Sequence, residues 1–260
     1  MTDASPELHT DTLGGTGGER LVLLHGFTQN RRCWGPFADD LARDHEVVLV
    51  DLPGHGGSAG IAADLPTAAD LVVAAGGRAT YVGYSLGGRI ALHAALRHPE
   101  LVARLVLVGA TAGIDDPSER AARRRHDEAL ADHLEEVGTE VFVDEWLAQP
   151  LFAGLRRDAA AVPERLRNPP AGLAASLRTT GTGTQEPSWD RLGSIQAPVL
   201  VMAGVDDGKF SALATRLGRE VGANATVALV PRSGHSTPFE NPADTASIIR
   251  RWLRSHPVTP

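Results

Sequence analysis

A serine between glycines, a later aspartate and a still later histidine are the residues whose types and spacing could do chemistry. The stretch Val82–Leu92 reads VGYSLGGRIAL and carries a G-x-S-x-G motif centred on Ser85. A serine hydroxyl becomes a base or a nucleophile when a histidine takes its proton and an acid orients that histidine. Asp207, in GVDDGKF, and His235, in PRSGHS, have the side chains for these roles. The sequence therefore predicts a catalytic triad of Ser85, Asp207 and His235.

Two further questions concern which aspartate is the acid of the triad and which groups would hold the negative charge that develops on the substrate. The predicted acid has a competitor, Asp206, directly before it in the sequence. A developing oxyanion is usually held by two backbone N–H groups, one after the serine and one in the loop after an early strand. Here these are expected to be the N–H groups of Leu86 and Phe27. His25, in LHGF, is expected to shape the loop that carries Phe27. His55, in PGHGGS, is expected to pack within a different loop.

The elements that must position these side chains follow a βαβ rhythm, in which short β-branched runs typical of buried parallel strands alternate with longer helical patterns. The expected strands are Leu21–Leu24, Val47–Val50, Ala79–Gly83, Leu105–Val108, Pro198–Gly204 and Thr226–Val230, and the expected helices are Trp34–Arg43, Ala68–Ala75, Leu86–His98, Ser211–Val221 and Ala243–Leu253. This rhythm predicts an α/β fold with a doubly wound, mostly parallel sheet. The three triad residues then follow carboxyl ends of strands and can converge on one cleft.

One segment, from about Gly113 to Ser188, breaks this rhythm. It lacks strand-like alternation, and SERAARRRHDEALADHLEEVG, TEVFVDEWLAQ and PAGLAASLRTT read as helices. We predict an α/β core of residues 1–112 and 189–260, with residues 113–188 forming a helical lid over the carboxyl edge of the sheet, where open α/β folds bind ligands. The alternative is that these helices are ordinary crossover connections within one continuous sheet.

Composition restricts the partners and the compartment. The chain has 260 residues and a formal net charge of −7, which disfavours a nucleic-acid partner. Its one cysteine, Cys33, excludes a disulfide framework and a CxxC motif. The first residues are polar and acidic, unlike a signal peptide, and no apolar run has the length of a membrane span. We expect a cytoplasmic protein that acts on a small molecule without a membrane partner, and its oligomeric state is left open.

With these residues placed, the chain resembles the α/β-hydrolase fold throughout, whose triads follow the chain order Ser, Asp, His. More narrowly, from about Leu21 to Pro242 it resembles the family of 2-succinyl-6-hydroxy-2,4-cyclohexadiene-1-carboxylate (SHCHC) synthases of menaquinone biosynthesis. The spacing in that family favours Asp207 over Asp206 as the acid. The motifs that carry the resemblance are LHGF, VDLPGHGGSA, GYSLGGR, ERAARRRHD, the W..QP.F pattern from Trp146 to Phe152, GVDDGKF and PRSGH...ENP.

The resemblance implies a lyase. Family members eliminate pyruvate from 2-succinyl-5-enolpyruvyl-6-hydroxy-3-cyclohexene-1-carboxylate with a triad that acts as a base, and they use no metal and no organic cofactor. That polycarboxylate substrate carries three carboxylates, and an arginine can hold a carboxylate through two parallel hydrogen bonds. This would explain the cation, Arg89, that follows the serine motif. By motif, the substrate-binding residues are expected to be Tyr84, Arg89, Arg123, Trp146, Gln149 and Arg167.

Two other functions remain open at the level of sequence. One is a serine hydrolase of a small ester, thioester or carbon–carbon bond, with Ser85 as a covalent nucleophile. The same triad serves both reactions, and only the arginines favour the lyase. The other is a ligand-binding member of the fold without catalysis, which an intact triad disfavours. Other lid arginines are expected to be solvated on helix faces, namely Arg124, Arg125, Arg156 and Arg157.

Overall fold

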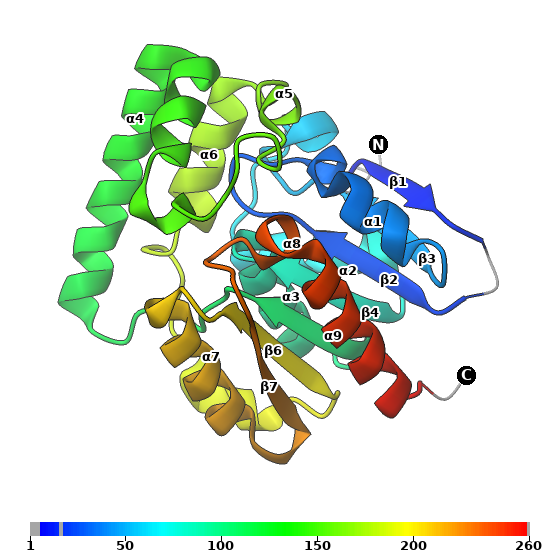
Figure 1. Ribbon diagram of the computed structural model, residues 1–260. Helices are drawn as coiled ribbons and strands as arrows, with labels where there is room; N and C mark the ends of the chain where they lie inside the picture. The colour runs from blue at the N-terminus through cyan, green and yellow to red at the C-terminus, as the bar shows by residue number, and fades with distance from the viewer. Residues whose placement is uncertain (1–5, 16–17, 259–260) are drawn as a thin grey trace, which may run out of the picture.

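A seven-stranded sheet runs through the centre of the computed structural model, which describes residues 6–15 and 18–258 (Figure 1). Its strand order is β1-β3-β2-β4-β5-β6-β7, and among the described strands β1 alone pairs in the antiparallel direction. The chain order reverses between β2 and β4, so the loops that follow these two strands lead apart and leave a crevice between them. The strands are β1 (Thr10–Leu13), β2 (Arg20–Leu24), β3 (Glu46–Val50), β4 (Ala79–Tyr84), β5 (Val102–Val108), β6 (Val199–Gly204) and β7 (Ala225–Val230).

Helices cover both faces of the sheet, which explains why the central strands are apolar on both sides. The helices of the core are α1 (Gly35–Leu41), α2 (Leu65–Gly76), α3 (Leu86–Arg97), α7 (Gly208–Val221), α8 (Thr237–Glu240) and α9 (Pro242–Ser255). Of these, α2, α3 and α7 pack on one face, and α1 and α9 pack on the other. Because alternate strand residues point to opposite faces, β2 gives Val22 and Leu24 to the first core and Leu21 and Leu23 to the second.

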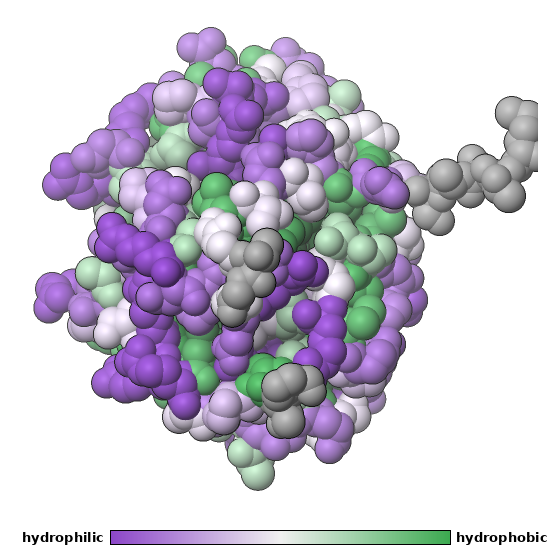
Figure 2. Space-filling view, turned by 90° about the vertical axis from the view of Figure 1, so that its right-hand side faces the viewer, coloured by the Kyte–Doolittle hydropathy of each residue, from purple (hydrophilic) through white to green (hydrophobic). Residues whose placement is uncertain are grey.

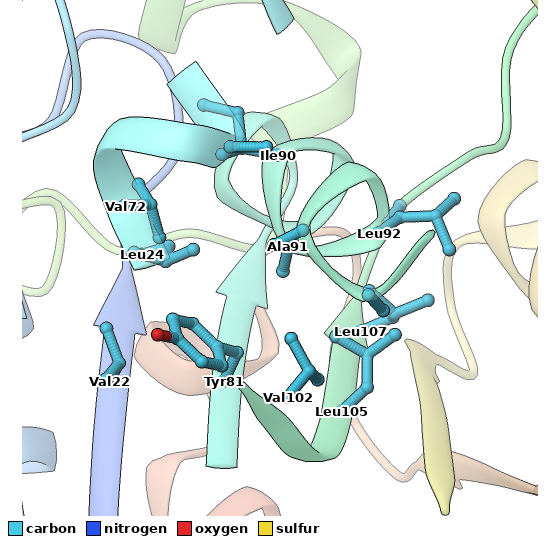
Figure 3. Packing of buried hydrophobic residues seen from close by; sticks show 14 of the residues in the cluster. Val22, Leu24, Val72, Tyr81, Ile90, Ala91, Leu92, Val102, Leu105 and Leu107 are labelled. Carbon is cyan, nitrogen blue, oxygen red and sulfur yellow. The ribbon is translucent and has the colours of Figure 1, made fainter. Parts of the chain in front are cut away.

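Apolar contacts anchor the helix that follows the serine motif. Figure 3 shows Ile90, Ala91 and Leu92 of α3 over side chains of the neighbouring strands, among them Leu24 and Leu105. All five of these side chains are completely buried. Burying a leucine or isoleucine side chain is worth roughly 1.5–3 kcal/mol. The core therefore fixes the position of α3, and with it the turn that carries Ser85.

The mostly parallel, doubly wound sheet predicted from the sequence is confirmed, with all six expected strands present. The sequence did not predict β1, because this strand is short, partly polar and held at the edge of the sheet by β3 alone. The expected helix Trp34–Arg43 is shorter in the structure, since a 3-10 turn, η1 (Arg31–Trp34), precedes α1. The helix after Ser85 ends at Arg97, two residues before Pro99, which agrees with the predicted end within one residue.

Residues 113–188, all of which the structure describes, connect β5 to β6 through helices and contain no strand. We call this segment the lid. Its helix α4 is interrupted at Gly138, whose φ of 78° lies outside the helical range, at the position where the sequence separates two expected helices. Helices α4 and α6 lie side by side (green in Figure 1) and share a small apolar core. The lid comprises α4 (Pro117–Leu147), η3 (Pro150–Phe152), α5 (Val162–Arg165) and α6 (Pro170–Thr180).

The surface seen in Figure 2 is mostly hydrophilic, and the apolar side chains on that face form small, separate groups. The extensive apolar clusters lie instead on the two covered faces of the sheet. Within the described ranges, no helix is both long enough and apolar enough to cross a bilayer.

Candidate active site

Ser85 lies in a sharp turn between β4 and α3. Its φ of 52° and ψ of −107° are rare for a residue other than glycine, and they are expected of the strained serine in a nucleophile elbow. The flanking glycines are required by close backbone contacts. A Cβ on Gly83 would lie 2.4 Å from the Gly87 carbonyl oxygen, and a Cβ on Gly87 would lie 2.1 Å from the Leu24 carbonyl oxygen. The G-x-S-x-G motif therefore forms a sharp turn from strand to helix.

His235 and Asp207 form a hydrogen-bonded line with Ser85. His235 Nε2 lies 3.2 Å from Ser85 Oγ, and His235 Nδ1 lies 3.2 Å from Asp207 Oδ2. Asp207 follows β6 and caps α7, where its carboxylate accepts the Phe210 N–H at 3.0 Å. The competing acid, Asp206, is exposed, and in the described part of the chain no hydrogen bond joins its side chain to His235. The structure thus brings Asp207 to the histidine.

The surroundings of Asp207 favour its charged form. Burial alone would raise the pKa of this carboxyl, but the hydrogen bonds from His235 and the Phe210 amide outweigh burial and lower the pKa. A carboxylate here keeps a proton on His235 Nδ1, so Nε2 can accept the proton of Ser85. Behind the imidazole, a Cβ on Gly109 would lie 2.9 Å from His235 Cε1. Only glycine at this position leaves the ring enough room.

Two backbone N–H groups near Ser85, those of Phe27 and Leu86, have no acceptor within the described residues. Both residues line the same cavity as Ser85. Leu86 is the first residue of α3, and the first N–H groups of a helix lack partners inside the helix and favour negative charge. Phe27 lies in the loop after β2, where the strand order reverses. These two amides are the candidate donors of an oxyanion hole.

His25 fixes the loop that carries Phe27. Its buried Nε2 accepts the Leu52 N–H at 3.1 Å, so the proton is on Nδ1, which donates to the Gly26 carbonyl oxygen at 2.8 Å. Burial lowers the pKa of His25 to about 4, which keeps the ring neutral near pH 7. His55 packs edge-on against this ring with the centroids 4.9 Å apart. Both histidines therefore occupy structural positions beneath the site.

The residue after Phe27 has a strained backbone that the lid holds in place. Thr28 has a φ of 65°, which a β-branched residue rarely adopts. Such strain costs about 1–3 kcal/mol and persists only where neighbours enforce it. Arg165 donates to Thr28 Oγ1 and, at 3.4 Å, to the Phe27 carbonyl oxygen. Asn168 Nδ2 donates to the Thr28 carbonyl oxygen at 2.8 Å. The sequence did not predict a role for Arg165 or Asn168.

A cavity of about 520 Å³ opens over Ser85 between the sheet and the lid. This volume is typical of a site for a small molecule. Within residues 6–15 and 18–258, no group of three or more His, Cys, Asp or Glu side chains is placed to hold a metal ion. The residues predicted from the sequence that line the cavity are Phe27, Ser85, Leu86, Arg89, Arg123, Trp146 and His235.

Arg89 is a buried cation in the wall of this cavity, with only 8% of its surface exposed. Its Nη1 donates to the Thr180 carbonyl oxygen at 2.7 Å, and no described carboxylate lies within ion-pair distance. Burial, and then the charge of nearby Arg123, lower the pKa of Arg89 to about 10, so it remains charged near pH 7. A buried cation without a counterion is costly. A ligand carboxylate would relieve that cost.

Arg123 reaches the cavity from α4 and is held by a buried acid. Its Nε donates to Asp127 Oδ1 at 2.7 Å, and Asp127 Oδ2 accepts the Gly183 N–H at 3.0 Å. Asp127 is almost completely buried, whereas the Arg123 side chain is 36% exposed. The guanidinium is thus fixed at one nitrogen, and its remaining donors make no hydrogen bond among the described residues.

Two further cations of the wall, Lys209 and Arg216 on α7, were not predicted as site residues. Arg216 pairs with Asp115 at 2.5 Å and lies 3.7 Å from the centre of the Trp189 ring, so its charge is already compensated. Lys209 has no carboxylate partner within the described residues. It is the one lysine of the chain and lies two residues after the predicted acid, a position that could have drawn attention to it.

Trp146 supplies apolar surface beside the oxyanion loop. Its indole meets the Phe27 ring edge-on, with the centroids 5.1 Å apart, and stacks on Phe142 at 5.9 Å. The indole Nε1 is buried and has no hydrogen-bond acceptor in the described residues. Trp146 therefore contributes apolar ring surface to the cavity wall.

Three predicted substrate-binding residues do not line the cavity. Tyr84 points to the face of the sheet that α1 and α9 cover, because side chains alternate between the two faces along β4. Its hydroxyl lies 2.6 Å from Ser236 Oγ. Arg167 is 61% exposed and pairs with Glu164 at 3.1 Å. Gln149 is half-buried directly before η3. Of the four lid residues that the motifs predicted, Arg123 and Trp146 line the cavity, whereas Gln149 and Arg167 do not.

Comparison with known proteins agrees with this architecture. Residues 21–248 match the family described as "Alpha/beta hydrolase family". A relative from Escherichia coli O1:K1 / APEC is 35% identical over 90% of this chain and 93% of its own length. A relative from Enterobacter sp. (strain 638) is 35% identical over 93% of this chain and 94% of its own length. Both are named 2-succinyl-6-hydroxy-2,4-cyclohexadiene-1-carboxylate synthase.

Solved structures are similar over nearly the whole chain. MenH from S. aureus has a TM-score of 0.87 and 28% identity, and the match covers 95% of this chain and 98% of that protein. A thermophilic esterase from Thermogutta terrifontis, solved with malate bound, has a TM-score of 0.81 and 26% identity over 96% of this chain and 94% of the esterase.

Proposed function

The chain belongs to the alpha/beta hydrolase family and, within it, groups with the SHCHC synthases, and from this premise we propose that it is a lyase of menaquinone biosynthesis. Its proposed reaction eliminates pyruvate from 2-succinyl-5-enolpyruvyl-6-hydroxy-3-cyclohexene-1-carboxylate and leaves SHCHC. The observation that carries this proposal is the presence of two cations, Arg89 and Arg123, in the cavity of Ser85. A substrate with three carboxylates would use such cations, whereas a small neutral ester would not.

The first step is removal of a ring proton. His235, oriented by Asp207, takes the proton of Ser85 Oγ across the 3.2 Å contact. The Ser85 alkoxide then takes the ring proton next to the succinyl ketone. The electron pair of that C–H bond moves toward the ketone oxygen and forms an enolate. Ser85 is thereby protonated again, and His235 keeps the proton that it accepted.

The second step breaks a carbon–oxygen bond. When the enolate re-forms the ketone, its electrons shift the ring double bond and expel the enolpyruvyl group from the ring. The departing enolpyruvate receives the proton held by His235 and becomes pyruvate, while the ring keeps a conjugated diene. No bond forms between Ser85 and the substrate. The reaction is balanced without an oxidant, a reductant or a cofactor.

The amides of Phe27 and Leu86 are suited to hold the negative charge of the enolate oxygen. Both are free to donate within the described residues, and neither must break a hydrogen bond first. Removing one such donor commonly costs 10²–10³-fold in rate, about 2.7–4 kcal/mol. The cations act at a different point. Arg89 and Arg123 would hold two of the carboxylates, which orients the ring so that its acidic proton meets Ser85.

A second candidate is a serine hydrolase, and the similarity to the Thermogutta terrifontis esterase favours it. In that reaction Ser85 would attack a carbonyl carbon and form an acyl-enzyme. The same triad and the same two amides would serve. The buried charge of Arg89 has no evident use in hydrolysis of a neutral ester, which is why the lyase is preferred.

The test is a direct assay with the enolpyruvyl substrate, in which diene absorbance and released pyruvate are followed together. The lyase reaction should give one diene for each pyruvate. A parallel assay with p-nitrophenyl acetate measures hydrolysis. Efficient ester turnover combined with no pyruvate release from the enolpyruvyl substrate would reject the lyase and leave the hydrolase.

A further inference from the structure

We propose that the lid positions the oxyanion hole, and that Arg165 and Asn168 are the positioning residues that do so. This inference rests on the proposed roles of Ser85 and of the Phe27 amide, but not on the identity of the substrate. It concerns the loop Gly26–Asn30, which we call the oxyanion loop, and the lid segment Glu164–Asn168, which we call the clamp. The two are more than 130 residues apart in sequence.

The clamp and the oxyanion loop are joined by hydrogen bonds from side chains to the backbone. Asn168 Nδ2 donates to the carbonyl oxygens of Thr28 and Gln29, at 2.8 and 3.2 Å. Asn30 Nδ2 donates in the other direction, to the Glu164 carbonyl oxygen at 2.7 Å. Arg165 contacts the Phe27 carbonyl oxygen and Thr28 Oγ1. These contacts act on the residues immediately around the Phe27 amide.

The strain at Thr28 shows what the clamp must achieve. A β-branched residue at a φ of 65° would relax toward a negative φ if its surroundings allowed it. A change of φ at Thr28 would turn the peptide between Phe27 and Thr28. Phe27 would have to move with this peptide, and its own N–H would shift in the Ser85 cavity. The clamp binds Thr28 at two atoms, the side-chain hydroxyl and the carbonyl oxygen. The lid therefore adds to the hydrogen bonds that the loop makes within itself, such as Gly26 N–H to Gln29 Oε1 at 2.8 Å, and stabilises the strained turn.

Arg165 is buried in a way that suits this role and not a contact with substrate. It is only 1% exposed, and it is absent from the cavity wall. Its Nε donates to the Ala160 carbonyl oxygen at 2.7 Å, within the lid itself. No described carboxylate pairs with it, and burial lowers its pKa. Its guanidinium is occupied by backbone and hydroxyl oxygens, so it connects the lid to the loop.

The experiment measures the rate at which a neutral fluorophosphonate probe labels Ser85, because this reaction needs the triad and the oxyanion hole but no carboxylate binding. Arg165→Ala should slow labelling by about 10–100-fold, the range expected when an oxyanion donor is misplaced. Hydrolysis of p-nitrophenyl acetate should fall in kcat with little change in KM. Arg156→Ala is the matched control, since Arg156 is an exposed lid arginine paired with Asp158 at 2.8 Å.

A second pair of variants tests the role of strain at Thr28. Thr28→Val keeps the β-branched strain and removes the hydroxyl that Arg165 holds, so it should slow labelling. Thr28→Gly removes the strain, because glycine adopts a positive φ readily. Added to Arg165→Ala, it should restore labelling by on the order of tenfold relative to the single variant. Loss of fold would lower the fraction of protein that is labelled, not the rate, and glycine would not restore it.

Three results would overturn the inference. The first is normal labelling in Arg165→Ala together with slow turnover of the enolpyruvyl substrate, which would make Arg165 a carboxylate-binding residue. The second is no recovery on adding Thr28→Gly. The third is equally fast labelling in Thr28→Val and the unaltered protein. If labelling behaves as expected but the enolpyruvyl substrate is not turned over, the positioning role stands and the proposed lyase function is rejected.

Discussion

The Arg89 guanidinium donates a 2.7 Å hydrogen bond to the carbonyl oxygen of Thr180, the last residue of α6. This contact fixes the arginine at one nitrogen between the core helix α3 and the lid. A guanidinium has five N–H donors, so several remain for a ligand in the cavity. The position of Arg89 relative to Ser85 is set by the first turn of α3, because the Arg89 N–H donates to the Ser85 carbonyl oxygen at 3.1 Å.

Arg89→Ala should lower kcat/KM for the enolpyruvyl substrate by roughly 10–100-fold, since a lost charge-assisted pair is worth about 1.5–3 kcal/mol. Arg89→Lys should restore only part, because an ammonium keeps the charge but not the planar pair of donors. Steady-state kinetics of pyruvate release measure both effects.

Hydrolysis of p-nitrophenyl acetate provides the control for Arg89. It needs the triad and the two amides but no carboxylate binding, so it should stay nearly unchanged in Arg89→Ala. An equal decrease in both reactions would mean that Arg89 supports the elbow structurally. No decrease in either would remove the main argument for an acidic substrate.

The triad residues should act as one unit. Ser85→Ala and His235→Ala should each abolish most turnover, and the double variant should lose little more than either single one. The fold should persist, as measured by circular dichroism, because the serine hydroxyl contributes little to packing. Multiplicative losses in the double variant would show that the two residues act independently.

The two candidate acids should differ strongly. Asp207→Asn should lower activity severely, because an amide cannot hold the His235 tautomer that leaves Nε2 free. Asp206→Asn should have a small effect, since the Asp206 side chain is exposed and no described hydrogen bond joins it to the histidine. The opposite ranking in folded, purified variants would reassign the acid to Asp206.

Lys209 should matter more than Arg167 for an acidic substrate. Lys209 lines the cavity, whereas Arg167 is 61% exposed and paired with Glu164. Lys209→Ala should lower kcat/KM by about two- to fivefold, as expected for a screened charge at the rim of a site, and Arg167→Ala should change it by less than about twofold. A larger effect of Arg167→Ala in the pyruvate-release assay would restore it as a substrate contact.

The protein should begin to lose stability at a pH well above the range in which carboxylates usually titrate. Burial lowers the pKa of His25 and His93 to about 4 and that of His55 to about 3, compared with 6.5 in the unfolded chain. Below pH 6.5 the unfolded chain binds protons that the folded chain does not, so stability is lost as the pH falls. Between pH 7.5 and 5.5, protonation of each of these histidines in the unfolded chain should lower the free energy of unfolding by about 1 kcal/mol. Urea denaturation at the two pH values measures this change.

His93→Gln is the control for the pH effect. His93 is buried on α3, and its Nε2 has no hydrogen-bond partner among the described residues. The variant should reduce the difference in unfolding free energy between the two pH values by about 1 kcal/mol, because one of several histidines whose pKa is lowered by burial, which also include His45, is gone. An unchanged difference would show that other groups cause the acid sensitivity.

The elbow, the triad and the parallel sheet could be predicted from the sequence because each depends on local patterns. Gly83, Ser85 and Gly87 form their turn from adjacent residues, and Asp207 and His235 each follow a strand that an apolar run reveals. Parallel strands then bring these positions to one edge. The chain order of the three residues was sufficient to place them together.

The lid contacts could not be predicted in the same way, since they depend on which face of a short helix meets the core. Arg165 and Arg167 are two residues apart, yet one is buried against Thr28 and the other is exposed. Tyr84 directly precedes Ser85, but the alternation of side chains along β4 turns it to the face that α1 and α9 cover. No pattern in the sequence indicates that Asn168 pairs with a loop 140 residues earlier.

The apolar core shared by α4 and α6 has a consequence for the motion of the lid. The buried residues of this core all lie within the lid, and Phe27 packs against them from the loop after β2. A movement that separated the lid from Phe27 would therefore leave the mutual packing of α4 and α6 intact. Segments of this kind exchange their amide hydrogens as one cooperative unit and do not fray residue by residue. Opening of the lid would therefore be a single event that admits solvent to the whole cavity at once. The residues of this core are Ala131, Leu134, Phe142, Leu173, Ala174 and Leu177.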